Sequence, residues 1–321
     1  MEFKMDYCPK CKMYSLIKYN EMQTCMSCGY KKMNIDYHSV VYPLMHNKAL
    51  HNHSFDILYQ INEDIQKIYQ TNLDIEALSY LKERGFNNDD IERFGFGYTR
   101  GKDVEKLLLK YPKDLLVTAG LLNPKTGKDF FFYRIMIPIR DNRHRIIGFG
   151  GRVLDNSKPK YINTPETPIF HKSSVFYGIH ELDLSSDSII LCEGYMDVIS
   201  MHKYGFNNAL AGMGTALTDN HALIIKQLEK KILCMYDSDD AGINATLKNM
   251  NLLGTYQIPC ASINLNPYKD PDEFLKSESI DSMNERLKHP CTQNQIQIQQ
   301  ENVLDINNWI FAVFNELGKY K

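Results

Sequence analysis

The sequence predicts an α/β protein built from four parts: a small cysteine-rich module, an α+β segment, a parallel α/β sheet and a short helical tail. Three observations lead to this prediction. Four of the eight cysteines lie close together near the N-terminus, short apolar runs alternate with helical patterns after residue 188, and an apolar stripe of helical spacing lies near the C-terminus. The length of 321 residues is sufficient for about two ordinary domains.

The composition is that of an ordinary globular protein, with 43% hydrophobic and 24% charged residues. It excludes collagen-like, mucin-like and wholly disordered chains. The N-terminal residues contain no apolar signal core, and every apolar run is far shorter than the roughly 20 residues of a membrane helix. We therefore expect no membrane association and a cytoplasmic location, in the host cytoplasm if the protein is viral.

The net charge of −2 argues at first against a nucleic-acid-binding protein, but the charge is unevenly distributed. Residues 125–172 contain ten Lys and Arg against four Asp and Glu, whereas residues 187–241 contain four against eight. A basic region that attracts phosphates beside an acidic region that attracts divalent cations is typical of phosphoryl-transfer enzymes. Two solvated faces of opposite charge are the alternative interpretation.

Residues 1–36 are predicted to form a zinc ribbon. Two C-x2-C turns supply the four thiolates that tetrahedral zinc requires. The expected ligands are Cys8, Cys11, Cys25 and Cys28. Lysines and tyrosines are interleaved around them, and these side chains either bind single-stranded nucleic acid or cover the metal. Cys192 and Cys234 lie in apolar runs instead, where a buried position is expected.

Residues 37–72 are predicted to be a linker because they show no clear hydrophobic period. Histidines are frequent in this segment, at His38, His46, His51 and His53. Their spacing fits no common ligand geometry, so a second metal site is not favoured.

Residues 73–180 are predicted to form a basic α+β subdomain. The expected elements are helices at 73–84 and 103–111 and strands at 130–139 and 145–149. The aromatic run at 130–133 is better explained as core than as a platform on which bases stack.

Residues 181–280 have the alternation of a parallel α/β sheet. The expected strands are 188–192, 209–211, 231–236 and 261–265. The expected helices are 196–204, 218–229 and 241–253, with Thr218 as the N-cap of the second. Carboxylates follow the strands at Glu193, at Asp237, Asp239 and Asp240, and in a turn over 269–274 that contains Asp270 and Asp272. Ligands bind at the carboxyl edge of such sheets, so these side chains are expected to converge on one site for a hard cation such as Mg²⁺.

Residues 281–321 are predicted to be a polar linker followed by a helix. The helix carries one apolar face and Trp309, the single tryptophan of the chain. Such a helix either packs back on its own domain, which is the more common case, or binds a partner.

Several segments together resemble the Toprim domain of bacterial DnaG-type DNA primases. They are Ile190-Leu-Cys-Glu193-Gly-Tyr-Met-Asp197-Val, Gly212-Met-Gly-Thr-Ala-Leu-Thr218, Tyr236-Asp-Ser-Asp239-Asp-Ala-Gly242 and Lys269-Asp-Pro-Asp272. Toprim domains also occur in topoisomerases and nucleases, but upstream segments resemble primases in particular. Those segments are Ile137-Pro-Ile-Arg-Asp141, Gly148-Phe-Gly-Gly-Arg152, Lys160-Tyr-Ile-Asn-Thr-Pro-Glu-Thr167 and Ile169-Phe-His-Lys172.

The resemblance implies a DNA-directed RNA polymerase that copies single-stranded DNA into short RNA primers from ribonucleoside triphosphates. It also implies catalytic Mg²⁺ or Mn²⁺, one structural zinc ion and a replicative helicase as partner. The implied metal ligands are Asp197, Asp237, Asp239, Asp270 and Asp272, with Glu193 as a general base or a further ligand. Glu193, Asp237 and Asp239 form the implied catalytic set. The implied nucleotide- and template-binding cations are Arg93, Arg152, Lys160 and Lys172.

Two features depart from the bacterial pattern. The zinc module has four cysteines in about 36 residues, which resembles phage primases more closely, and the residues after 277 are too few for the usual helical bundle. A Toprim nuclease or topoisomerase-like enzyme, and a zinc-bearing single-strand DNA-binding replication factor with an inactive site, are the rival interpretations.

Overall fold

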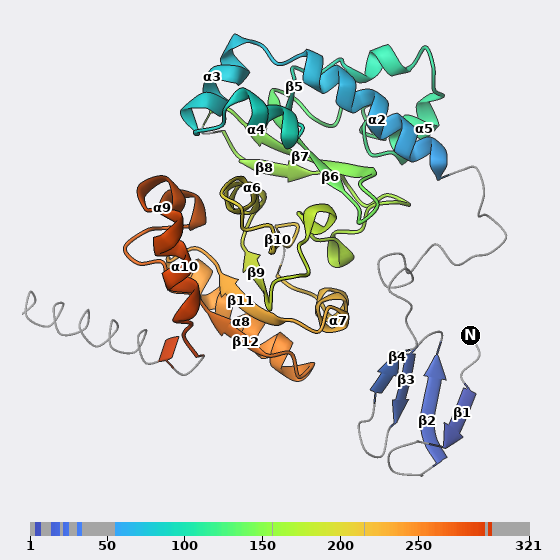
Figure 1. Cartoon of the computed structure of the whole chain (residues 1–321). Coiled ribbons are helices and arrows are strands. Elements are labelled where there is room, and N and C mark those ends of the chain that lie inside the picture. The colour runs from blue at the N-terminus through green and yellow to red at the C-terminus, as the bar shows by residue number, and fades with distance from the viewer. Residues whose placement is uncertain are drawn as a thin grey trace, which may run out of the picture. The chain divides into compact units, whose positions relative to one another are not determined.

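The computed structural model describes residues 55–155, 157–214, 216–292 and 295–296 in full, and four strands between residues 4 and 33 by their backbone. The chain divides into two compact units, Met1–Ala49 and Leu50–Lys321. Figure 1 shows the strands and helices of both units. The predicted zinc ligands Cys8, Cys11 and Cys28 and the predicted terminal helix lie outside the described residues.

The first unit contains a four-stranded antiparallel sheet in the order β1-β2-β3-β4. The strands are β1 (Lys4–Tyr7), β2 (Tyr14–Tyr19), β3 (Met22–Cys25) and β4 (Lys31–Met33). Ile17 in β2 lies opposite Met5 on one side and Thr24 on the other. The predicted ligand Cys25 is thus the last residue of β3, and the zinc site itself stays a prediction.

The second unit begins with an antiparallel sheet in the order β5-β6-β7-β8. Its strands are β5 (Gly97–Thr99), β6 (Arg134–Arg140), β7 (Ile146–Val153) and β8 (Tyr161–Asn163). Every residue of β7 is buried, which explains why its sequence lacks the alternation of a half-exposed strand. Strands were expected here at 130–139 and 145–149, so the first begins four residues later and the second runs four residues further.

Helix α2 (Asp56–Thr71) packs against β5 and β7, and Figure 1 shows it lying across this sheet. The linker predicted over residues 37–72 is therefore wrong for residues 56–71. The buried stripe of α2 includes Asn62 and Gln66, which interrupt the apolar pattern. The Asn62 side chain donates to the Ile146 carbonyl and the Gln66 side chain to the Gly95 carbonyl, so burial of these two amides is compensated.

Shorter helices complete this half of the unit, which we call the N-terminal half (residues 55–181). They are α3 (Ile75–Glu83), α4 (Asn88–Arg93), η1 (Val104–Leu107), α5 (Lys113–Thr118), η2 (Lys172–Ser174) and η3 (Ile179–Glu181). The helix expected over 73–84 is confirmed as α3. The helix expected over 103–111 is reduced to the single turn of η1, at whose start the Val104 amide donates to the buried Asp129 carboxylate. Pro112, the N-cap of α5, limits any continuation of this turn.

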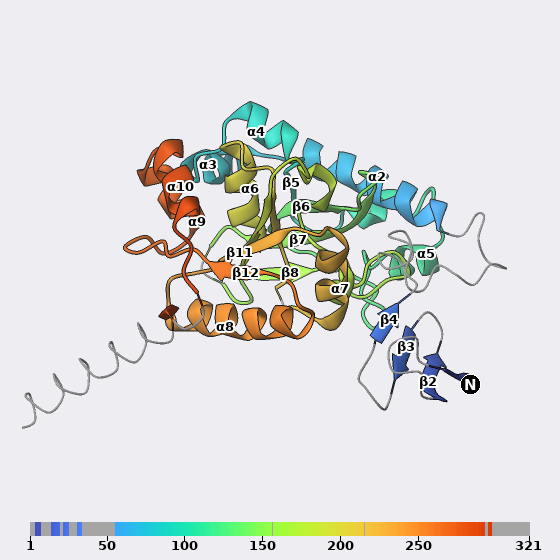
Figure 2. The same cartoon turned by 60° about the horizontal axis from the view of Figure 1, so that its bottom comes forward.

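The C-terminal half (residues 188–288) contains a parallel sheet in the order β10-β9-β11-β12. Its strands are β9 (Ser188–Cys192), β10 (Ala209–Ala211), β11 (Lys231–Met235) and β12 (Cys260–Ser262). Its helices are α6 (Tyr195–Lys203), α7 (Asp219–Gln227), α8 (Asp240–Thr255), α9 (Pro271–Ser277) and α10 (Ile280–Lys288). Figure 2 shows α7 and α8 on one face of this sheet and α6 on the other. The predicted alternation and the Thr218 N-cap are confirmed.

The carboxylate-rich turn expected over residues 269–274 is in large part a helix. Asp270 accepts a hydrogen bond from the Glu273 amide and so caps α9, with Pro271 as its first residue. Asp272 therefore lies in the first turn of a helix. Cys192 and Cys234 are fully buried in β9 and β11, as predicted.

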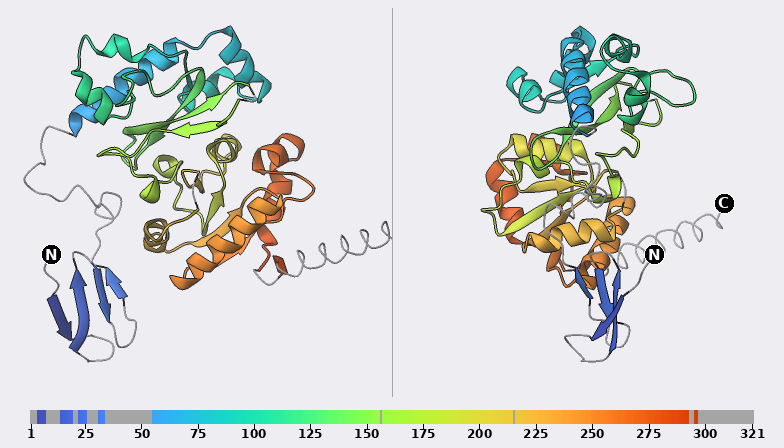
Figure 3. Two further views of the ribbon diagram at one scale, coloured as in Figure 1. Left: turned by 180° about the vertical axis from the view of Figure 1, so that it is seen from behind. Right: turned by 90° about the vertical axis from the view of Figure 1, so that its right-hand side faces the viewer.

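The two halves of the second unit pack through β7, β8 and α6, and Figure 3 shows them from behind and from the side. A Cβ atom at Gly150 of β7 would lie 2.6 Å from Cε2 of Tyr195, the first residue of α6. The Tyr195 hydroxyl donates to Asn163 of β8, and the Asn163 amide donates to the Met213 carbonyl at 2.9 Å. Glycine at position 150 thus permits the close approach of the halves. No helix within the described ranges combines the length and apolar character that crossing a bilayer requires.

We predict opposite effects of alanine at the two glycines of α8. A Cβ atom at Gly242 would overlap the backbone carbonyl of Asp237, whereas one at Gly254 would meet no atom within 4 Å. Gly242→Ala should lower the free energy of unfolding by about 1 to 3 kcal/mol, and Gly254→Ala should raise it by up to about 1 kcal/mol. Urea unfolding followed by circular dichroism measures both, and a stabilised Gly242→Ala would contradict the packing described here.

Candidate active site

A cavity of about 900 Å³ lies where the two halves of the second unit meet. Cations of the N-terminal half line it, and so do carboxylates and a glycine-containing loop of the C-terminal half. The cations are Arg84, Arg152, Lys160 and Lys172, and the carboxylates are Glu193, Asp197, Asp237, Asp270 and Asp272. The structure therefore brings together most of the residues that the sequence predicted as one site.

The carboxylates reach the cavity from the carboxyl ends of neighbouring parallel strands. Glu193 directly follows β9 and Asp237 follows β11 by two residues, and these two strands pair in register. Asp197 lies in the first turn of α6, and Asp270 and Asp272 lie at the start of α9. Residues far apart in sequence thus meet at one edge of the sheet, as open parallel sheets require.

Burial and mutual repulsion act on these carboxylates. Burial raises the pKa of Glu193, and the nearby Asp237 raises it further. Burial also raises the pKa of Asp237, although Lys269 lies 3.2 Å away and opposes the shift. Asp197 is the extreme case, because burial and then the Asp270 charge raise its pKa to about 8. Such a concentration of carboxylates attracts a divalent cation.

Three of the predicted ligands also hold helix N-termini. Asp197 accepts from the Gly194 amide, Asp239 from the Gly242 amide and Asp270 from the Glu273 amide. A cap uses one carboxylate oxygen, so it restrains the side chain and still leaves acceptor capacity. Asp239 is exposed and is not one of the residues that line the cavity. Its charge nevertheless contributes to the raised pKa of Glu193 and of Asp237, so it lies near both, and its catalytic role stays a prediction.

The donor set suits a hard cation such as Mg²⁺, since carboxylate oxygens dominate it. Moreover, Oδ1 of Asp272 is buried and has no hydrogen-bond partner in the part of the chain that the structure describes. Among the residues described in full, however, no three His, Cys, Asp or Glu side chains lie close enough to hold one ion as they stand. Rotation of carboxylates would therefore accompany the binding of a cation.

The cationic side of the cavity is centred on Arg152 of β7. Its Nε donates to the Tyr80 hydroxyl and its Nη1 to the Tyr161 hydroxyl, and its guanidinium lies 5.5 and 5.1 Å from the centres of these rings. Partial burial lowers the pKa of Lys160, and repulsion by Arg152, Lys269 and Arg84 lowers it further. The clustered positive charge favours a phosphate ligand.

Lys172 is held by the segment around it. Its backbone amide donates to Glu166, which also contacts His171 at 3.0 Å. Arg93 differs from the other predicted cations because it is not among the residues that line the cavity. It pairs with Glu181 at 3.0 Å and donates to the His202 carbonyl at 3.3 Å. In this structure Arg93 thus links the end of α4 to α6.

Sequence reasoning missed several residues of the cavity. Arg84 pairs with Asp272 at 2.9 Å from the end of α3, and Lys269 pairs with Asp237. Lys269 lies inside the quoted Lys269-Asp-Pro-Asp272 segment, so that segment could have suggested it. Phe130 also lines the cavity, whereas Phe131 is buried and Phe132 and Tyr133 are exposed. The aromatic run predicted to be core is therefore core at Phe131 alone.

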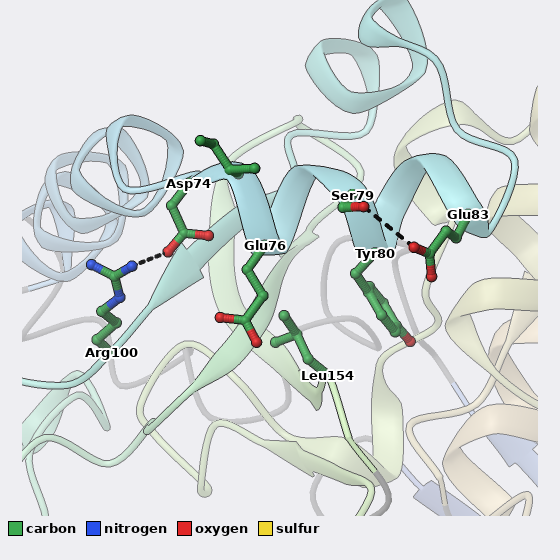
Figure 4. A pocket seen from close by; sticks show the side chains of 8 residues that line it. Asp74, Glu76, Ser79, Tyr80, Glu83, Arg100 and Leu154 are labelled. Carbon is green, nitrogen blue, oxygen red and sulfur yellow. Dashed lines mark hydrogen bonds and ion pairs between the residues drawn. The ribbon is translucent and has the colours of Figure 1, made fainter.

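A second hollow, of about 680 Å³, lies on the outer side of α3. Figure 4 shows Asp74, Glu76, Ser79 and Glu83 of this segment around it, with Leu154 opposite. Tyr80 lines this hollow, and its hydroxyl accepts from Arg152, which lines the larger cavity.

Comparison with known proteins identifies this arrangement. The family model "DNA primase catalytic core, N-terminal domain" matches residues 65–183, and the model "Toprim-like" matches residues 190–275. A solved DnaG primase catalytic domain bound to ssDNA is 32% identical, with a TM-score of 0.70 over 77% of this chain and 83% of that one. The Aquifex aeolicus primase (zinc-binding and RNA polymerase domains) is 28% identical, with a TM-score of 0.68 over 90% and 81%.

Curated relatives lead to the same family. The DNA primase of Clostridium acetobutylicum is 40% identical over 240 residues, which are 71% of this chain and 40% of the relative. That of Escherichia coli K12 is 34% identical over 253 residues, 74% of this chain and 44% of the relative. The chain belongs to the DnaG-type DNA primase family. It spans about two fifths of the length of the curated relatives it matches.

We predict that acid weakens the anchoring of the Lys172 segment through His221. This buried side chain contacts the Val175 carbonyl through Nε2, and its Nδ1 accepts from the Thr218 amide. Burial lowers its pKa to about 4, against 6.5 in an unfolded chain. The unfolded state therefore binds the extra proton first, and stability falls as the pH drops from about 6.5 to about 4, by about 3 kcal/mol in total.

Urea unfolding at pH 7 and at pH 4.5 measures this loss. Other groups titrate in the same range, so the difference between wild type and His221→Gln isolates the contribution of His221. The exposed His289 provides the matched control, since His289→Gln should keep the full acid sensitivity. Equal acid sensitivity in wild type and His221→Gln would refute the prediction.

Proposed function

We propose that this chain is a DNA primase, a DNA-directed RNA polymerase that synthesises short RNA primers on single-stranded DNA. The observation that carries the proposal is the cavity between the halves, where Lys160 and Arg152 face Glu193 and Asp237 in a DnaG-family core. Cations for the phosphates and carboxylates for a divalent cation are what nucleotidyl transfer requires. Single-stranded DNA as template is supported by the related catalytic domain that was solved with it.

The residues would divide the work as follows. Arg152, Lys160 and Lys172 would bind the triphosphate of the incoming ribonucleotide and the template backbone. Asp197, Asp237, Asp270 and Asp272, with Glu193, would hold Mg²⁺ or Mn²⁺. When bound, the ion would activate the primer 3′ hydroxyl and neutralise the pyrophosphate leaving group. Burial raises the pKa of Glu193, which strengthens this carboxylate as a proton acceptor.

The N-terminal unit would add template selection. We propose that Cys8, Cys11, Cys25 and Cys28 bind one structural zinc ion, and that this module reads the initiation sequence. Four thiolates at this spacing fit tetrahedral zinc, and the related Aquifex aeolicus structure is described as containing a zinc-binding domain. A replicative helicase is the proposed partner of the complete protein, because primers are needed where that enzyme exposes single strands.

Primer synthesis tests the main proposal. Purified protein with mixed-sequence single-stranded DNA, four ribonucleotides and Mg²⁺ or Mn²⁺ should yield short template-dependent RNAs. Glu193→Gln should reduce synthesis by at least about a hundredfold, since it removes a general base or metal ligand, while DNA binding persists. Asp240→Asn is the matched control: Asp240 is exposed, borders the same acidic cluster and does not line the cavity.

The products distinguish the rival functions. Cleaved DNA in place of RNA would support a Toprim nuclease or topoisomerase-like enzyme. Binding of DNA without synthesis or cleavage, in the presence of either metal, would support the accessory factor. Primer synthesis by Glu193→Gln at the wild-type rate would contradict the catalytic role assigned to Glu193.

Metal analysis tests the zinc proposal. Wild type should contain about one zinc ion per chain, and Cys25→Ser should lose most of it, because three thiolates hold zinc less tightly than four. The same variant should impair initiation more than it impairs the fold of residues 55–288. Cys291→Ser is the control outside the cysteine-rich module. Full zinc content in Cys25→Ser would exclude Cys25 as a ligand.

A further inference from the structure

Arg84 connects the two walls of the cavity. It caps the C-terminus of α3 in the N-terminal half, and its Nη2 donates to Oδ2 of Asp272 in α9, at 2.9 Å. The two residues are 188 positions apart, and both line the cavity. Arg84 also contributes to the positive charge that lowers the pKa of Lys160. The Arg84 guanidinium therefore contacts the acidic wall and adds its positive charge to the cationic wall.

This ion pair is incompletely satisfied. Oδ2 of Asp272 accepts from both Arg84 and Lys276, the latter at 2.6 Å, whereas Oδ1 is buried and has no partner among the described residues. Nε of Arg84 is likewise buried, and no described residue forms a hydrogen bond with it. An unpaired buried polar group costs about 1 to 3 kcal/mol. Two such atoms on the two sides of one ion pair, in a polar cavity, indicate that each side can take a ligand: a cation at Asp272 and an anion at Arg84.

The neighbouring carboxylates do not offer Arg84 another partner within this cavity wall. Glu76 and Glu83, on the same helix, line the outer hollow shown in Figure 4. The Ser79 hydroxyl donates to Glu83 there, at 3.3 Å. The Arg84 guanidinium, at the end of α3, is thus directed across the cavity to Asp272. Release from Asp272 would leave the guanidinium beside Lys160 and Arg152, where a phosphate would bind.

We propose that Arg84 exchanges partners during substrate loading: it holds Asp272 in the free enzyme and binds the nucleotide triphosphate once a divalent cation occupies Asp272. The exchange couples the two events, because the cation that frees Arg84 also neutralises the carboxylate that held it. It rests on the proposed function, in which this cavity takes a nucleotide and a divalent cation. Lys276, which shares Oδ2 but does not line the cavity, only neutralises Asp272.

The exchange predicts effects of opposite sign for one substitution. Arg84→Gln removes a cation that competes for Asp272, so Mn²⁺ should bind more tightly without nucleotide. The same change removes a phosphate ligand, so ATP should bind more weakly to the protein saturated with Mn²⁺. Each effect should be about tenfold, since a hydrogen bond to a charged group is worth about 1.5 to 3 kcal/mol. Lys276→Gln, the matched control, should tighten Mn²⁺ binding and leave ATP binding unchanged.

Two titrations of the zinc-loaded full chain measure these affinities. Electron paramagnetic resonance of free Mn²⁺ gives the metal affinity without nucleotide, and calorimetry with ATP at saturating Mn²⁺ gives the nucleotide affinity of the metal-loaded protein. Arg84→Lys, which keeps the charge, should retain wild-type Mn²⁺ affinity and lose part of the ATP affinity. It also keeps the test valid if Arg84→Gln does not fold.

The outcomes separate the exchange from a purely structural role. Weaker binding of both Mn²⁺ and ATP by Arg84→Gln would indicate that Arg84 only stabilises the packing of the two halves, and it would overturn the proposal. Unchanged Mn²⁺ affinity in Arg84→Gln, or weaker ATP binding in Lys276→Gln, would overturn it as well. Neither titration uses DNA or primer synthesis. A wild-type protein that shows the predicted binding pattern but makes no RNA would therefore refute the proposed function and leave the exchange standing.

Discussion

Repulsion between carboxylates is the constraint around which the second unit is organised. Glu193 and Asp237 follow strands that end at the same edge of the parallel sheet. The starts of α6 and α9 add Asp197, Asp270 and Asp272 to this cluster. Burial and the neighbouring negative charges both favour protonation of such a cluster, and burial first and the Asp270 charge second raise the pKa of Asp197 to about 8. Helix N-termini and the cations of the N-terminal half offset the repulsion. The packing of the two halves thus also brings the cations of one half close to the carboxylates of the other.

Helix capping and metal binding are compatible uses of the same side chains. A single Asp at the start of a helix is most simply explained as a cap, and Asp197, Asp239 and Asp270 do form caps. Only two of these three line the cavity, however. The cap fixes the position of a carboxylate through folding, so less conformational freedom is lost when an ion binds. Local structure and function therefore reinforce each other at Asp197 and Asp270.

The sequence was informative wherever the decisive interactions are local. The strand and helix alternation, the Thr218 cap and the acidic edge of the sheet follow from short-range patterns. Helix α2 escaped prediction because the partners of its buried Asn62 and Gln66 are carbonyl groups 84 and 29 residues away. Arg84 escaped for the same reason, since its partner Asp272 is identified only by the fold. Arg93 fitted the family pattern, but the fold pairs it with Glu181.

The contact between Gly150 and Tyr195 has a mechanical consequence. Tyr195 lies two residues before Asp197, in the same first turn of α6, and its ring rests where β7 carries no side chain. A tilt of the antiparallel sheet would therefore move the first turn of α6 directly, because a rigid ring and not a flexible linker lies between them. The geometry of a buried carboxylate in one half is in this way tied to the position of a strand in the other.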